Sequence, residues 1–451
     1  MRCINAESKI PLTILGVALQ KTSIYFWVGR LLLVLGVWIF STYWYSNMNE
    51  IKIAIVSASF PPVTYGGVGT AHYTLSTMLQ QYNFSVKMFS YKDIQGNDHG
   101  KNQICRFKLP RFLSAFLNIL IKIFWRFFDK TAPCIHLKEA LASIAGGLAT
   151  KIRIRQFKPD ILIVPDRGAV GLWIGKPKNC RVIAVMHHNP DRFRSPLLFG
   201  FTPSSIDIDM AIKLERLALK NFDEIVCPSR YMAECFKSTF GVREVSIIPN
   251  VISIADVNVS QKKASKAPIK NSPPTIYIPS AAVSNKGERY LFEVVRRISK
   301  KIPETLFFIS GGLTPVQETE IRIAGLADRV DAPGRLSYAE NLAKVAACRL
   351  CVSTSLTENY SMALCEASLF GIPCVAFDAG GVRDIIHDGK TGFLVPLLDI
   401  DTLVEKTVFL LQNAEILHAF GAEAQNATRA AMIQAEQSWL TLIEKLAYKN
   451  V

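Results

Sequence analysis

Two carboxylates stand eight residues apart in the stretch TENYSMALCEASLFGIP, residues 357–373. Small and apolar residues surround Glu358 and Glu366, and this setting argues against a surface helix with two solvated glutamates. An ionised carboxylate only accepts hydrogen bonds, so it suits the paired hydroxyl groups of a sugar or a ribose. The two acids therefore indicate a binding site for a ligand rich in hydroxyl groups.

The elements that carry the two acids are predicted from the local pattern. Residues 350–353 (LCVS) form an apolar strand that leads into the loop with Glu358. Residues 361–370 have helical character and end at a Gly-Ile-Pro stop, so Glu366 lies inside this helix. Eight residues at about 100° each place both acids on nearly one side. The free N–H groups of the helix amino terminus suit a pyrophosphate.

Apolar runs alternate with helical segments in two series along the 451 residues. This alternation is typical of doubly wound parallel sheets, whose ligands lie beyond the carboxyl ends of the strands. We therefore predict an α/β protein with two Rossmann-like domains that face each other across a cleft. The predicted strands are residues 51–57, 85–91, 160–165, 181–186, 224–227 and 245–248 in the first series, and residues 275–279, 305–310, 350–353 and 374–377 in the second.

The domain boundaries follow from these two series. A Lys-, Ser- and Pro-rich stretch without apolar periodicity separates them and is predicted to be a linker. The last residues are predicted to form a helix, a candidate to pack back on the first domain. The predicted segments are a hydrophobic amino-terminal segment (1–49), the first domain (50–251), the linker (252–274), the second domain (275–430) and the carboxy-terminal helix (431–451).

A glycine-rich loop follows the first strand. Gly66, Gly67 and Gly69 precede a helix predicted over residues 70–81, and strand, loop, helix and strand make a βαβ unit. Glycine lets the backbone approach a phosphate closely. The Gly66–Gly67 pair is therefore a candidate phosphate contact.

Composition narrows the class of partner. The formal net charge of +15 favours polyanions, that is, nucleic acid, an anionic membrane or phosphorylated ligands. The chain has no recognition helix, zinc-finger pattern or RNA-binding signature, so we do not expect a nucleic-acid partner. Cys348 and Cys351 form a C-x-x-C pair without a second pair or nearby histidines, which favours buried thiols over a metal site.

Two segments point to a membrane. Residues 23–45 are long and apolar enough to cross a bilayer, although a true start at Met48 is the alternative, because the sequence from Met48 resembles the opening of an α/β domain. Residues 106–130 combine a basic stripe with Phe, Leu, Ile and Trp on the other faces. Two interpretations stay open for this second segment: a helix that binds the membrane interface, or a core-facing helix with a solvated basic face.

The motifs as a whole resemble the retaining glycosyltransferases of family 4, which have the GT-B fold. The E-x7-E element followed by GIPCVAFDAGGVRDIIHDGKTGFLVP carries the resemblance. SASFPPVTYGGVGTAHYTLSTML, VMHHN, IVCPS, SIIPN, NKGERYLFEVV and FFISGG match further landmarks over residues 51–401. The sequence around the two acids, ENYSMALCEASLFGIPCVAFDAGG, is most similar to that of bacterial enzymes of capsule, exopolysaccharide and lipopolysaccharide synthesis.

The resemblance assigns roles to matching residues. Glu366 would bind the nucleotide ribose, and Glu358 and His187 would contact the donor sugar near the reacting centre. Lys286, in the Asn-Lys-Gly element, would neutralise the leaving diphosphate. The backbone near Tyr360, Ser361 and Met362 would hold phosphate, as would Gly66 and Gly67 from the first domain, which would bind the acceptor.

The chain departs from the family pattern at two places. Ala281 replaces the Arg that usually stands five residues before the lysine, with Arg289 as a candidate substitute. Asp384 replaces the Glu of the Gly-Gly-x-x-Glu motif and keeps its charge. The missing Arg puts donor affinity in doubt. One alternative is therefore a degenerate protein that serves as a membrane-associated scaffold or sugar-binding component, and a nucleotide-sugar epimerase is the other.

The resemblance implies a transfer reaction that retains anomeric configuration and needs no metal or other cofactor. A sugar would move from a nucleotide-sugar donor to a glycan or lipid-linked glycan in cell-surface polysaccharide synthesis. Because nucleotide sugars are cytoplasmic in bacteria, we expect the protein at the cytoplasmic face of the inner membrane, either peripheral or anchored by residues 23–45. The basic residues and the 106–130 segment suit an anionic membrane surface.

Overall fold

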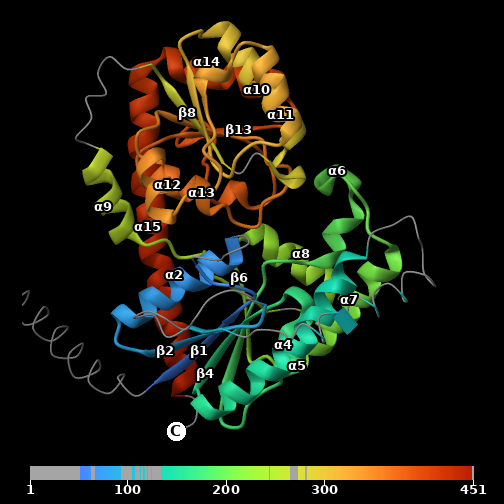
Figure 1. The fold of residues 1–451 in the computed structure, drawn as a ribbon. Coiled ribbons are helices and arrows are strands. Elements are labelled where there is room, and N and C mark those ends of the chain that lie inside the picture. The colour runs from blue at the N-terminus through green and yellow to red at the C-terminus, as the bar shows by residue number, and fades with distance from the viewer. Residues whose placement is uncertain are drawn as a thin grey trace, which may run out of the picture.

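The structure, a computed structural model, describes residues 51–61, 67–92, 104–106, 134–242, 244–264, 273–279 and 282–448, with the single positions 112, 115, 116, 119 and 123. Figure 1 shows two domains, each with helices around a central sheet, and a long helix that runs beside both. None of the helices in the described part of the chain is long and apolar enough to span a bilayer. Residues 23–45 lie outside the described part.

The first domain has a seven-stranded parallel sheet in the order β3-β2-β1-β4-β5-β6-β7. Its central strands are buried on both faces, as all-parallel sheets require. Helices α2 and α15 cover one face, and α4, α5 and α8 cover the other. The strands are β1 (Lys52–Ser57), β2 (Ser85–Ser90), β3 (Ile104–Arg106), β4 (Ile161–Pro165), β5 (Arg181–Val185), β6 (Glu224–Cys227) and β7 (Ser246–Ile247).

The helices of this domain connect consecutive strands. They are α2 (Gly67–Gln81), α4 (Ile135–Phe157), η1 (Arg167–Ala169), α5 (Val170–Ile174), η2 (Pro190–Arg194), α6 (Pro196–Phe199), α7 (Ser205–Ala218), η3 (Leu219–Asn221) and α8 (Arg230–Phe240). The short α6 projects toward the second domain (Figure 1).

The second domain repeats the doubly wound pattern with a six-stranded parallel sheet in the order β10-β9-β8-β11-β12-β13. The strands are β8 (Thr275–Ile278), β9 (Leu306–Ile309), β10 (Val330–Asp331), β11 (Leu350–Ser353), β12 (Cys374–Phe377) and β13 (Gly392–Val395). The helices are η4 (Ser284–Lys286), α10 (Glu288–Lys301), α11 (Pro315–Ile323), η5 (Ala327–Arg329), α12 (Tyr338–Val345), α13 (Met362–Leu369), η6 (Gly381–Asp384) and α14 (Ile400–Gln412). The predicted α/β class with two Rossmann-like domains is confirmed.

Two segments that join the domains differ from the sequence prediction. The predicted linker contains a helix, α9 (Ile254–Ala264), and Val257 on it is fully buried in the second-domain core. The carboxy-terminal helix, α15 (Ala414–Ala447), begins well before residue 431 and is continuous. Leu417 and Met432 of this helix belong to the second-domain core, and its last turns add Trp439 and Ile443 to the first-domain core. The helix therefore fastens one domain to the other (Figure 1).

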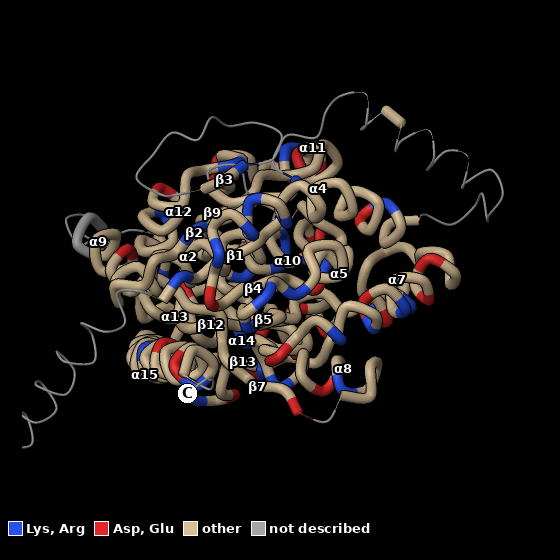
Figure 2. Tube along the Cα trace, turned by 90° about the horizontal axis from the view of Figure 1, so that it is seen from below, with Lys and Arg blue, Asp and Glu red and all other residues tan. Residues whose placement is uncertain are grey.

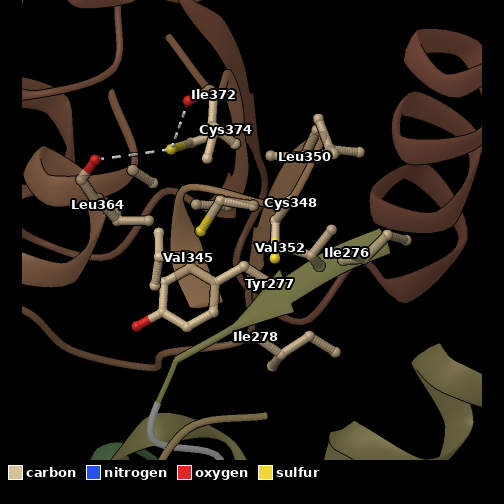
Figure 3. Close-up of a cluster of buried hydrophobic side chains, with 14 of the residues drawn as sticks. Ile276, Tyr277, Ile278, Val345, Cys348, Leu350, Val352, Leu364, Ile372 and Cys374 are labelled. Atoms are coloured by element: carbon tan, nitrogen blue, oxygen red, sulfur yellow. Dashed lines mark hydrogen bonds between the residues drawn. The ribbon is translucent and has the colours of Figure 1, made fainter. Parts of the chain in front are cut away.

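The core of the second domain contains the two cysteines of the C-x-x-C pair. Figure 3 shows Cys348 in this core, near Tyr277. Cys348 and Cys351 are free and buried beside Tyr277, and burial raises the pKa of the Cys348 thiol to about 12. Both thiols are therefore protonated at neutral pH and pack as small apolar groups. The interpretation of this pair as buried thiols is confirmed.

Basic and acidic residues are intermingled over the described trace, as Figure 2 shows from below. The net charge of the chain is therefore not gathered on one face of the two sheets in this view. In the sequence, residues 106–130 hold six Lys and Arg against a single Asp. Most of that segment lies outside the described residues.

Candidate active site

The loop that carries Glu358 is held by backbone contacts with two glycines, Gly380 and Gly381. Glu358 pairs with Gly380 in an isolated parallel bridge, and the Gly381 N–H donates to the Glu358 carbonyl at 2.9 Å. A Cβ on Gly381 would stand 1.9 Å from the Asn359 carbonyl oxygen, so only glycine permits this approach. Glu358 therefore lies in a loop at the carboxyl end of β11, and helical spacing does not relate it to Glu366.

Lys286 forms an ion pair with Glu358, with 2.6 Å between Nζ and Oε1. The turn around Lys286 is docked on the end of β11, because the Leu356 N–H donates to the Asn285 carbonyl and the Thr354 hydroxyl donates to the Lys286 carbonyl. Gly287 has φ +78°, and a Cβ on it would stand 2.1 Å from the Thr354 carbonyl oxygen. The Asn-Lys-Gly element thus places the predicted cation beside the predicted carboxylate.

Glu366 lies on α13 among buried helical residues. It is 5 % exposed, and its neighbours include Tyr338 and Tyr277. Burial raises the pKa of Glu366 to about 7, against the opposing effect of the Tyr338 hydroxyl. Because burial disfavours its charged form, the Glu366 carboxylate is stabilised by a ligand that donates hydrogen bonds to it.

The amino terminus of α13 faces the same strand ends as Glu358. Ser361 occupies the N-cap position but its side chain does not cap the helix. The N–H groups of the first turn, from Met362 onward, therefore remain for another acceptor, and an anion suits this end of a helix. Tyr360 is buried just before it. The predicted phosphate-binding stretch 360–362 lies at this helix start.

His187 follows β5 at the carboxyl edge of the first sheet. The side chain is buried, its Nε2 atom has no hydrogen-bond partner among the described residues, and its ring lies 5.7 Å from the ring of His72. Burial, with a smaller effect of His72, lowers the pKa of His187 to about 3. The imidazole is therefore neutral at physiological pH and offers a single N–H to a ligand.

Asp166 positions this histidine, although the sequence pattern alone did not single it out. Its Oδ2 atom accepts from the backbone N–H groups of His187 (2.9 Å) and His188 (2.8 Å). Burial raises the pKa of Asp166 to about 6, against the opposing effect of these two hydrogen bonds. Its place directly after the apolar strand DILIVP is the one signal in the sequence that could have identified it.

The two halves of the site meet where the first and second domains contact each other. The Asn359 side-chain amide donates to the His187 carbonyl, so the loop of Glu358 contacts the loop of His187. The Asp384 carboxylate accepts from the Arg230 N–H at 2.7 Å, at the amino terminus of α8. Asp384, which replaces the Glu of the family motif, therefore joins the second domain to the first.

Some predicted positions do not enter this geometry. Gly66 and Ala281 lie outside the described residues. Gly67 is the first residue of α2, and a Cβ there would meet open space. Arg289 is exposed in the first turn of α10, and its guanidinium donates to the Leu197 carbonyl of α6 at 3.2 Å. Arg289 thus contacts helix α6 of the first domain.

Two family models match the chain, one for each domain. The model described as "Glycosyltransferase Family 4" matches residues 65–256, and "Glycosyl transferases group 1" matches residues 259–427. One component of the phosphatidylinositol N-acetylglucosaminyltransferase of Arabidopsis thaliana is 27% identical over 82% of this chain and 77% of its own length. A GDP-mannose-dependent phosphatidylinositol monomannoside mannosyltransferase of Mycobacterium tuberculosis is 29% identical over 39% of this chain and 46% of its own length.

Solved structures share the architecture. The sucrose-phosphate synthase of Thermosynechococcus elongatus superposes with a TM-score of 0.66, at 17% identity over 88% of this chain and 99% of that one. The HepE protein of Anabaena in complex with UDP-glucose gives a TM-score of 0.63, at 16% identity over 88% of this chain and 100% of that one. At such identities the likeness establishes the fold. With both domains matched by family models, the chain belongs to the family 4 glycosyltransferases of the GT-B fold.

Proposed function

We propose that this glycosyltransferase moves a sugar, with retention of anomeric configuration, from a nucleotide-sugar donor to a glycan or lipid-linked glycan of the cell surface. The observation that carries the proposal is the Lys286–Glu358 pair, 2.6 Å apart, at the start of α13 and next to the loop of His187. A cation, a helix amino terminus and hydroxyl acceptors converge there from both domains. HepE, which has the same fold, is described in complex with UDP-glucose.

Each group has a role in this reaction. The donor diphosphate lies at the α13 amino terminus and against Lys286, while Glu366 accepts from the ribose hydroxyls. Glu358 and the neutral His187 bind the sugar. The bond from the anomeric carbon to the diphosphate oxygen breaks, and a bond to the acceptor oxygen forms on the same face. The acceptor proton passes to the departing diphosphate, whose charge Lys286 and the helix stabilise without a metal ion.

An anionic membrane is the proposed docking surface for a lipid-linked acceptor. Phe112, Phe116, Ile119 and Ile123 are helical, half or more exposed, and spaced to share one helix face. This exposure favours the interfacial interpretation over a core-facing helix, and basic residues interleave with them in the sequence. The relatives from Arabidopsis and Mycobacterium have names that include a phosphatidylinositol lipid. We place the protein at the cytoplasmic face of the membrane.

The test is ligand-induced thermal stabilisation of the full chain in a mild detergent. UDP, GDP and a panel of their sugar derivatives are compared for wild type, Glu366→Ala, and Glu405→Ala as a matched control. Glu405 is an exposed carboxylate on α14 and lies outside the proposed site. A ligand that binds only the folded state raises the melting temperature by mass action. We expect one donor to stabilise wild type and the control but not Glu366→Ala.

The products then separate the alternatives. Transfer with retention gives a product whose anomeric proton coupling in NMR matches that of the donor. Conversion of the donor into another nucleotide sugar without an acceptor would identify an epimerase. Absence of stabilisation by every nucleotide would overturn the transferase proposal in favour of the degenerate scaffold.

A further inference from the structure

Arg192 reaches from the first domain to both sides of Glu358. It lies in η2, and its guanidinium donates through Nη1 to the Asn359 side-chain oxygen and through Nη2 to the Thr357 hydroxyl. The guanidinium carbon stands 5.2 Å from the ring centroid of Tyr231, which provides a flat support on the first domain. The residues immediately before and after Glu358 are therefore held by one side chain of the other domain.

Asn359 extends this contact to the predicted donor histidine. Its amide oxygen accepts from Arg192, while its amide nitrogen donates to the His187 carbonyl. The acceptor and the donor group of the Asn359 side chain thus both form hydrogen bonds with the other domain. Separation of the domains would break the bonds from Arg192 and the bond to His187 together.

The segment that follows Arg192 contacts the helix that begins just after Lys286. Helix α6 packs Leu198 against the second-domain core, and its Leu197 carbonyl accepts from Arg289 at 3.2 Å. Arg289 stands three residues after Lys286, in the first turn of α10. Residues 190–199 of the first domain therefore contact the loop of Glu358 at one end and the helix after Lys286 at the other.

We propose that Arg192 is a positioning residue that orders the Glu358 loop when the two domains close. The planar fork of arginine reaches two acceptors at once, which the single ammonium group of lysine does not reproduce. In the closed form Arg192 holds Thr357 and Asn359, so that the Glu358 carboxylate faces Lys286 and the sugar. The role of Glu358 in this inference rests on the proposed function.

Arg194 provides the matched control. It lies two residues along the same helical turn and is 43 % exposed, and its guanidinium contacts Asp191 and Asp209, both in the first domain. Loss of Arg194 therefore removes the same charge without touching the loop of Glu358.

The experiment compares the full chain in detergent as wild type, Arg192→Ala, Arg192→Lys and Arg194→Ala. Hydrogen exchange is followed by mass spectrometry in peptides that cover residues 355–361. We expect at least tenfold faster exchange there in Arg192→Ala and Arg192→Lys, and wild-type exchange in Arg194→Ala. Equal exchange in Arg192→Ala and wild type would overturn the inference, whether or not a donor is known.

Nucleotide binding and turnover separate positioning from a general loss of structure. UDP affinity, measured by calorimetry, is expected to change less than threefold in Arg192→Ala, while kcat with the donor from the panel falls at least tenfold. Arg192→Ala combined with Asn359→Ala should cost less in kcat than the sum of the two single changes, because the two side chains share one hydrogen bond. If the two losses of kcat were simply additive, the Arg192–Asn359 contact would not be the way in which Arg192 acts on the loop. If wild type binds neither UDP nor GDP, the proposed function fails while the exchange result still decides the role of Arg192.

Discussion

Buried acids and histidines set the chemistry of the site at the scale of single residues. Burial raises the pKa values of Glu366 and Asp166 to about 7 and about 6, and lowers that of His187 to about 3. The desolvation that disfavours charge on these groups has the same origin in each case. His187 therefore stays neutral over the physiological range, whereas Glu366 titrates within it.

We predict that Glu366→Gln stabilises the ligand-free protein at pH 8 but not at pH 4. The folded-state pKa of Glu366 is raised from 4.5 to about 7, so the protonated acid favours folding below pH 4.5 and this contribution is lost as the pH rises through 7. The loss amounts to about 3 kcal/mol, from roughly 1.4 kcal/mol per pKa unit. Glutamine removes the titration. Melting temperatures of the two proteins should coincide below pH 4.5, diverge between pH 4.5 and about 7, and stay apart above that; parallel curves would contradict the prediction.

Tight turns fix the site at the scale of elements. The Asn-Lys-Gly turn docks on the end of β11, and the Gly380–Gly381 pair docks on the loop beyond it. Both contacts bring backbone against backbone, which only glycine allows. Motifs that are far apart in the sequence therefore lie within hydrogen-bond distance of one another in the structure.

We predict that Gly381→Ala destabilises the protein by about 1–3 kcal/mol, the usual cost of overpacking. The new Cβ would stand 1.9 Å from the Asn359 carbonyl oxygen and displace the loop of Glu358. Turnover should therefore fall more than the melting temperature alone explains. Gly241→Ala is the control, because a Cβ on Gly241 meets open space while its φ of +71° adds roughly 1–2 kcal/mol of backbone strain, a loss of stability similar to that of Gly381→Ala. Equal effects on turnover from the two changes would refute this role of Gly381.

The elements that the sequence pattern did not predict have a common physical reason. Strands β3, β10 and β13 all lie at sheet edges, where burial is incomplete, and β3 and β10 are only three and two residues long. Helix α9 was missed because β-branched residues, Asp, Asn and Ser, which have low helix propensity, fill much of its sequence IADVNVSQKKA, and its helical conformation is supported by Val257 in the core of the second domain. The central strands, which are buried on both faces, were all predicted.

At the scale of the whole molecule, two segments matter. Helix α15 packs against both domains, and the 106–130 segment is the proposed contact with a membrane surface. Helix α15 contributes side chains to both cores, so one continuous helix connects the two domains. The exposed apolar positions at 112, 116, 119 and 123 belong to the first domain. A membrane bound through them would therefore contact the proposed acceptor domain.

We predict that Phe112→Ser combined with Phe116→Ser weakens binding to anionic vesicles at least tenfold. Burial of a large apolar side chain is worth roughly 1.5–3 kcal/mol, and Phe112 and Phe116 are 77% and 54% exposed. Sedimentation with phosphatidylglycerol-containing and neutral vesicles measures the effect in a chain that begins at Met48, which retains every described element. Ile323→Ser, at an 80% exposed position of the second domain, is the control. Binding that is unchanged by the double substitution would argue against this face.

Short-range patterns in the sequence determined the class of fold, the central strands, the helix of Glu366 and the turns that carry Lys286 and the glycine pair. Those features depend on residues a few positions apart, so periodicity and turn chemistry reveal them. Only the tertiary structure decided which groups act on Glu358 from the other domain. Arg192 lies 165 positions before Thr357, and the Asn359–His187 contact spans 172 positions. Such contacts depend on how two independently patterned domains dock, and no local pattern encodes that geometry.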